Sequence, residues 1–183
     1  MLLGLAPVLA SDEPAKDPKS DLSRFEVVID APASFVYPYV VEGDRIANWS
    51  HDDRLEISFP RGTQAAVGMQ IHFAIRLPTR PGWTVEIRRL IPDREMDTAI
   101  TDGIFRGSLD FLVEPLGEGR ARLVHVAKVQ PEGAFIQFAW EVAGRRIHHK
   151  KMEELMLRIK KLVESDWIAQ GSTAKRREGG SEP

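Results

Sequence analysis

The 183-residue chain contains no cysteine, which excludes disulfide bonds, thiolate nucleophiles and cysteine-ligated zinc or iron–sulfur sites. It also lacks an excess of charge of one sign, because 25 Lys and Arg stand against 27 Asp and Glu, giving a formal net charge of -2. No global field attracts nucleic acid, so DNA or RNA binding is not expected. The longest apolar runs are far shorter than the roughly 20 residues of a membrane-spanning helix. We therefore expect no segment that crosses a bilayer.

The composition is that of an ordinary globular protein, with 43% apolar and 28% charged residues. We expect an N-terminal extension over residues 1–21, one folded domain over 22–168 and a disordered tail over 169–183. Met1–Ala10 is almost entirely apolar but has no basic n-region, so it reads as an extension or as an export-signal remnant. The first interpretation predicts a cytoplasmic protein, which we favour, and the second an exported or periplasmic one.

The folded part opens with a strand and two short helices. Phe25–Ile29 is a β-rich run, and Pro32 then stands near the first turn of a helix, where its missing N–H is tolerated. This first helix is expected over Ala33–Val41. A second short helix is expected over Asp44–Trp49, because the Asp side chain can cap its start.

Apolar and polar residues then alternate for about eighty residues, which is typical of an antiparallel meander. Met69, Ile71, Phe73, Ile75 and Leu77 share one face of their strand, so the sheet has one dry side to cover. The strands expected in this region are Leu55–Phe59, Met69–Leu77, Trp83–Ile91, Glu95–Thr101, Arg106–Glu114 and Arg120–Val129.

A long helix from Glu132 or Phe135 to about Asp166 is expected to cover that side, and Gly144 could bend it. Three- and four-residue steps separate its apolar residues, which therefore form one stripe. That stripe contains Val142, Met152, Leu155, Met156, Ile159, Leu162 and Val163. The sequence thus predicts an α+β fold, with a curved antiparallel sheet of about seven strands around one long C-terminal helix.

Three stretches resemble the START-related (SRPBCC) superfamily, whose helix-grip fold includes birch-pollen-allergen-like proteins and bacterial polyketide cyclase/dehydrase-like proteins. Val27–Val36 is similar to its first strand and Ala-Pro turn, and Phe111–Pro115 with Gly117–Leu123 to its penultimate hairpin. Phe138–Glu164 is similar to its last helix, and the resemblance covers about Leu22–Ser165. It implies a cavity between sheet and helix for sterols, fatty acids, polyketides or quinones, and no single activity.

Two histidines are candidates for a polar role in such a cavity. His148 precedes Met152 and Leu155 by four and seven residues, so it shares the apolar stripe, and Glu141 lies seven residues before it. It could exchange a hydrogen bond or a proton with a ligand. The alternatives are that His148 lies at the exposed start of the helix, or that its imidazole hydrogen-bonds to Glu141. His125 alternates with apolar residues and should face the concave side, as a ligand contact or a satisfied core histidine.

Familiar enzyme motifs are absent from the sequence: it has no phosphate-binding loop, no HExxH helix and no nucleophile elbow. Carboxylates suitably spaced for a metal do not accompany the two histidines, so we expect neither a metal nor a cofactor.

The run Arg145-Arg146-Ile147-His148-His149-Lys150-Lys151 is the densest positive patch. Through Arg145, Arg146, Lys150 and Lys151 it could contact an anionic membrane transiently, at about 1 kcal/mol per basic residue. The alternative is a solvated helix face, balanced by the acidic residues downstream.

We expect a protein that binds an apolar ligand such as a lipid, sterol, quinone or polyketide. Transport of that ligand would be an extension of this role. An alternative is a polyketide cyclase/dehydratase-type enzyme in which His125, His148 or Glu141 moves protons, and a further one is a protein-interaction module. The expected ligand-binding residues are Trp49, Ile71, Phe73, Ile75, Trp83, Leu109, Phe111, His125, Trp140, His148, Met152 and Met156.

Overall fold

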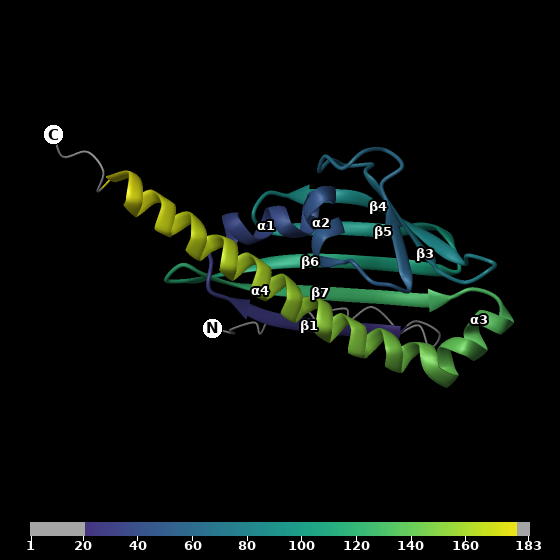
Figure 1. Cartoon of the computed structure of the whole chain (residues 1–183). Coiled ribbons are helices and arrows are strands. Elements are labelled where there is room, and N and C mark those ends of the chain that lie inside the picture. The colour runs from purple at the N-terminus through teal and green to yellow at the C-terminus, as the bar shows by residue number, and fades with distance from the viewer. Residues whose placement is uncertain (1–20, 179–183) are drawn as a thin grey trace, which may run out of the picture.

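The computed structural model describes residues 21–178, and it folds them into one antiparallel seven-stranded sheet beside a long helix (Figure 1). The strands are β1 (Asp21–Ile29), β2 (Leu55–Ser58), β3 (Gln70–Ile75), β4 (Gly82–Ile91), β5 (Glu95–Gly103), β6 (Phe105–Gly117) and β7 (Arg120–Pro131). The helices are α1 (Ala33–Val41), α2 (Gly43–Trp49), α3 (Ala134–Ala139), the π-helical turn η1 (Trp140–Gly144) and α4 (Arg145–Glu178). The predicted α+β architecture is confirmed.

The sheet is an antiparallel meander to which the first strand adds at one edge. Its spatial order is β1-β7-β6-β5-β4-β3-β2, so each strand from β2 to β7 lies beside its neighbour in sequence and β1 returns to pair with β7. The register sets Phe25 of β1 opposite His125 of β7, and His125 opposite Phe111 of β6. Because directly paired residues share a face, these three side chains form one row across the sheet.

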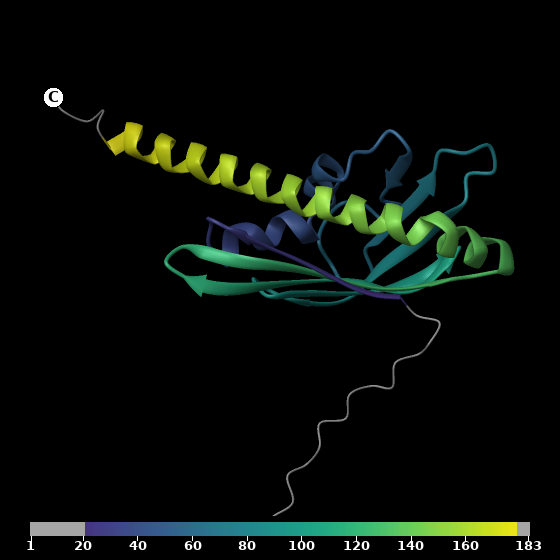
Figure 2. The same cartoon turned by 90° about the horizontal axis from the view of Figure 1, so that it is seen from below.

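All the helices lie on the same side of the sheet, and α4 runs along its length (Figure 2). Met156, Ile159 and Val163 of α4 are buried against it, as the three- and four-residue spacing predicts. No helix among the described residues is long and apolar enough to span a bilayer.

Polar contacts fasten the middle of α4 to the rest of the domain. The Tyr39 hydroxyl of α1 donates to Asp166 at 2.6 Å, and the amide of Asp30 donates to Glu164 at 2.9 Å. Arg158 donates to the carbonyl oxygens of Trp49 and His51 at 3.1 and 2.7 Å. These contacts fix the position of α4 over the concave face of the sheet.

Gly107 allows β6 to approach β7 closely. It has φ of +117°, and a Cβ atom built there would lie 1.8 Å from the carbonyl oxygen of Lys128. No other residue type fits that conformation without moving the strand.

The structure corrects the expected boundaries at two places. Leu77 lies beyond β3 and is exposed, because the strand ends in a turn where the amide of Ile75 donates to the carbonyl of Pro81. The tail expected from residue 169 is helical as far as Glu178, since a helix already formed propagates until something stops it. Residues 1–20 and 179–183 lie outside the described residues. What the sequence predicts for them therefore stays a prediction.

Candidate ligand-binding site on the concave face

Aromatic rings contact one another in series across the concave face. Successive centroids lie 4.4–6.3 Å apart in the order Trp49, Phe111, His125, Phe25, His148, Trp140, Phe105, Trp83 and Phe73. These rings come from α2, the sheet, η1 and α4, so the series joins the sheet to the helix that covers it. We call it the aromatic track.

One end of the aromatic track is closed and the other is open. Phe25, Phe111 and His125 are buried, with His125 only 3% exposed. At the other end Phe73, Trp83 and Phe105 are only half-buried. The open end also includes the half-buried Leu109 and Met152. Large apolar side chains therefore remain partly accessible on the side of the sheet that faces α4.

His125 is held as a neutral hydrogen-bonding group. Its Nδ1 lies 3.0 Å from the carbonyl oxygen of Asp110, and a carbonyl only accepts, so the proton is on Nδ1 and Nε2 keeps its lone pair. Burial lowers the pKa of His125 to about 4, the hydrogen bond to Asp110 opposes this shift, and nearby His148 adds to it. The ring is therefore uncharged near neutral pH and can act as an acceptor through Nε2.

Trp140 brings a buried donor to the same region. Its side chain is 7% exposed, and Nε1 has no hydrogen-bond partner among the described residues. Gly144 makes room for the ring, since a Cβ atom there would lie 2.9 Å from Cε3 of Trp140. A buried N–H without an acceptor is destabilising by about 1–3 kcal/mol, so this indole can gain from an acceptor that a ligand supplies.

The structure places Glu141 outside the interior. Its carboxylate lies on the exposed side of the helix and accepts a hydrogen bond from Arg145 at 2.8 Å. The seven-residue spacing to His148 assumed an unbroken α-helix, but the amide of Arg145 donates to the carbonyl of Trp140, five residues back. This π-helical turn adds one residue and rotates the preceding segment by about 100°. Trp140 therefore takes the inward position, and Val142 is exposed for the same reason.

His148 is half-buried in the position that its spacing predicted. Its ring centroid lies 5.5 Å from that of Trp140 and 6.2 Å from that of Phe25. It therefore stands between the sheet and η1, within the aromatic track. Two of the three residues named as proton carriers are brought together at the concave face, and Glu141 is not.

The remaining predicted ligand-binding residues lie at different depths. Ile71 and Met156 are buried in the main core, and Ile75 is half-buried at the end of β3. The sequence argument missed Phe25 and Phe105. The predicted strand began at Arg106, so Phe105 lay outside it, but β6 begins at Phe105. Phe25 could have been found by pairing the first and last strands, because this pairing sets it opposite His125.

The basic residues do not share one face. Lys151 pairs with Asp52 at 3.0 Å and with Glu154 at 3.3 Å, so it belongs to a contact between α4 and the segment before β2. Arg146 and Lys150 are exposed and make no ion pair with any residue in the described range. Lys151 is thus engaged in ion pairs, and the contact of Arg145, Arg146, Lys150 and Lys151 with an anionic membrane stays a prediction.

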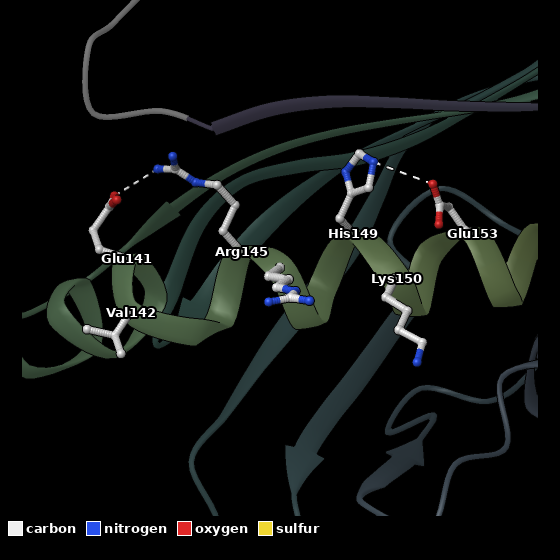
Figure 3. A pocket seen from close by; sticks show the side chains of 7 residues that line it. Glu141, Val142, Arg145, His149, Lys150 and Glu153 are labelled. Atoms are coloured by element: carbon white, nitrogen blue, oxygen red, sulfur yellow. Dashed lines mark hydrogen bonds and ion pairs between the residues drawn. The ribbon is translucent and has the colours of Figure 1, made fainter.

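The surface of residues 21–178 has hollows, and two of them are defined by their lining residues. One, of about 470 Å³, lies along η1 and the start of α4 and is lined by Val142, Arg146, Lys150 and their neighbours (Figure 3). The other, of about 600 Å³, is lined by residues of β4, β6, the turn after β4 and the start of β5. Neither contains the aromatic track. Within residues 21–178 there is no group of three or more His, Asp or Glu side chains that could hold a metal ion.

No protein-family model matches the chain, and no curated protein sequence matches it. Solved structures do. TTHA0849 from Thermus thermophilus superposes with a TM-score of 0.64 at 14% identity, covering 80% of this chain and 99% of that one. Ara h 8.0201 gives 0.57 at 12% identity, covering 80% and 99%. The Zhui aromatase/cyclase from Streptomyces sp. R1128 gives 0.59 at 14% identity, covering 79% and 94%. At such identities the likeness establishes the fold, which is the helix-grip fold that the sequence resemblance implied.

Proposed function

We propose that the protein binds an apolar small molecule that carries a hydrogen-bond acceptor, between the concave face of the sheet and α4. The observation that carries this proposal is the buried Nε1–H of Trp140, which has no acceptor among the described residues. Buried polar groups in folded proteins are nearly always hydrogen-bonded, so an exception next to an accessible apolar surface favours a ligand.

The open end of the aromatic track supplies the apolar part of such a site. Phe73 and Trp83 are stacked with centroids 5.1 Å apart, and Phe105 meets Trp83 edge-on at 5.2 Å. All three are half-buried, so a flat or chain-like ligand that covers them removes apolar area from water at about 25 cal/mol per Å².

The polar groups restrict which ligands fit. Trp140 can only donate, so it selects a carbonyl, ether or hydroxyl oxygen. His125 is neutral and accepts through Nε2, which suits a hydroxyl group on the ligand. Quinones, polyketides and sterols carry such groups on apolar frameworks.

An enzyme of the polyketide cyclase type is the alternative, and the similar Streptomyces aromatase/cyclase supports it through the fold. A general base works best when its pKa lies near the operating pH. Burial lowers the pKa of His125 to about 4, which makes it a weak base. Binding needs neither proton transfer nor a catalytic carboxylate, so the geometry supports it better.

A matched pair of ligands tests the proposal: fluorenone and fluorene have the same tricyclic shape, and only fluorenone has an acceptor oxygen. Both are titrated into the protein while tryptophan fluorescence is recorded. We expect both to bind, and Trp140→Phe to weaken fluorenone about 2- to 10-fold, the value of one net hydrogen bond, while fluorene is unaffected. Trp167→Phe is the control, because this ring contacts Phe35 of α1 in a tilted arrangement, with centroids 5.0 Å apart, and is no part of the aromatic track.

Binding of neither ligand would mean that the aromatic track is an ordinary part of the core, and the proposal would be wrong. Equal weakening of both ligands by Trp140→Phe would show that Trp140 acts by packing and not as a donor. Native mass spectrometry of the purified protein would then be the direct search for a natural ligand of another kind.

A further inference from the structure

The segment where α3 meets α4 exposes large apolar side chains in a group. Phe135 is 78% exposed, Phe138 67% and Val142 68%, although each belongs to a helical element. Helix α3 itself contains no charged residue. Single exposed apolar residues are common, but three from one short segment mark an interaction surface.

Two cations adjoin these apolar side chains. Arg146 and Lys150 follow Val142 at four-residue steps, are exposed, and make no ion pair within residues 21–178. Figure 3 shows Val142 and Lys150 on one side of the helix, while Glu141, Arg145, His149 and Glu153 line the other side in two ion pairs. Glu141 is therefore neutralised in place by Arg145, and Glu153 faces the imidazole of His149 on the same side. The positive charge of Lys150 lies on the side of Val142.

The helix that carries Phe135 and Phe138 lies at an end of the molecule. In both views α3 occupies one end of the molecule, opposite the end to which the last turns of α4 extend (Figures 1 and 2). A flat surface can therefore approach the end of the molecule that α3 occupies, and Phe135 and Phe138 belong to this helix.

We propose that Phe135, Phe138, Val142, Arg146 and Lys150 form a docking face for the surface of an anionic lipid bilayer. Apolar side chains that insert at the level of the head groups, flanked by cations that meet lipid phosphates, are the pattern of interfacial helices. A second copy of this chain fits less well, because a two-fold contact through this face would bring Arg146 and Lys150 of both copies together. The proposal concerns a different surface from the ligand site and stands whether or not a ligand binds.

The test is cosedimentation of the full chain with vesicles of phosphatidylcholine, alone or mixed with phosphatidylglycerol. We expect partitioning into the mixed vesicles that weakens as salt is added. Lys150→Gln should reduce it about fivefold, whereas Lys161→Gln, about three turns further along the same helix, should leave it unchanged. Phe138→Gln should reduce it about tenfold or more, Phe138→Leu should retain it, and Leu157→Gln, another exposed apolar site on α4, should have no effect.

Three results would overturn the proposal. One is equal partitioning into neutral and mixed vesicles, and another is an equal loss from Lys150→Gln and Lys161→Gln. The third is a dimer in size-exclusion chromatography that Phe138→Gln dissociates, since the face would then contact a second copy. Circular dichroism of each variant checks that the helices are intact; Phe138→Leu keeps the test valid even where Phe138→Gln unfolds α3.

Discussion

His125 should make the protein lose stability in mild acid, and His125→Asn should remove that loss. Well above pH 6.5 the imidazole is neutral in the folded and the unfolded chain alike. Between pH 6.5 and about 4, His125 is protonated in the unfolded chain but stays neutral in the folded one. The free energy of unfolding therefore falls as the pH falls. At roughly 1.4 kcal/mol per pKa unit, the loss reaches about 3 kcal/mol by pH 4.

Asparagine is the informative replacement because its amide nitrogen stands where Nδ1 stands and can still donate to Asp110. The variant loses ring packing at every pH, but it does not titrate. Urea denaturation followed by tryptophan fluorescence at a series of pH values gives both curves. Their difference should shrink by about 3 kcal/mol from neutral pH to pH 4. His51→Asn is the control, since its side chain is 75% exposed.

A difference between wild type and His125→Asn that stays constant over this range would refute the reasoning. It would mean that the imidazole of His125 accepts a proton as readily in the folded chain as in water. The ring would then be charged in mild acid, and its role as a neutral acceptor beside the ligand would have to be abandoned there.

Other predictions concern packing, backbone conformation and a tyrosine. Ile159→Ala should lower the free energy of unfolding by about 2–5 kcal/mol, because the side chain is fully buried. Leu157→Ala, on the exposed side of α4, should lower it by less than about 0.5 kcal/mol. Urea denaturation measures both changes. Gly107→Ala should lower it by at least about 1–3 kcal/mol, since the residue has φ of +117° and no space for a Cβ atom, and an unchanged urea midpoint would contradict this. Burial and the hydrogen bond to Asp166 raise the pKa of Tyr39 to about 12, so Asp166→Asn should move part of the alkaline absorbance titration to lower pH.

Most of the fold follows from local patterns in the sequence. Alternation located all the strands after α2 to within a few residues, and it set His125 on the concave face with its apolar neighbours, where the structure has it. The buried stripe from Met152 to Val163 followed from helical spacing alone. These patterns work because each depends on one periodicity within one element.

The parts that could not be predicted depend on breaks in periodicity and on distant partners. The π-helical turn at Trp140–Gly144 has no local signature strong enough to displace an α-helix, yet it moves Glu141 out of the interior and Trp140 into it. The ion pair of Lys151 with Asp52 likewise joins segments about a hundred residues apart. A seven-residue spacing is therefore informative only where the helix between its two ends is continuous.

The same turn connects the two proposed surfaces. Trp140 follows α3 directly, and its ring lies 5.3 Å from Phe105 at the open end of the aromatic track. The donor, the half-buried rings and the exposed Phe138 thus lie within one short stretch of the fold, at the end away from the contacts that fasten α4 to α1. A bilayer that meets Phe138 would stand next to the least enclosed part of the concave face. An apolar ligand could then pass between membrane and protein at the place where its exposure to water is shortest, which is a physical reason for the two surfaces to be neighbours.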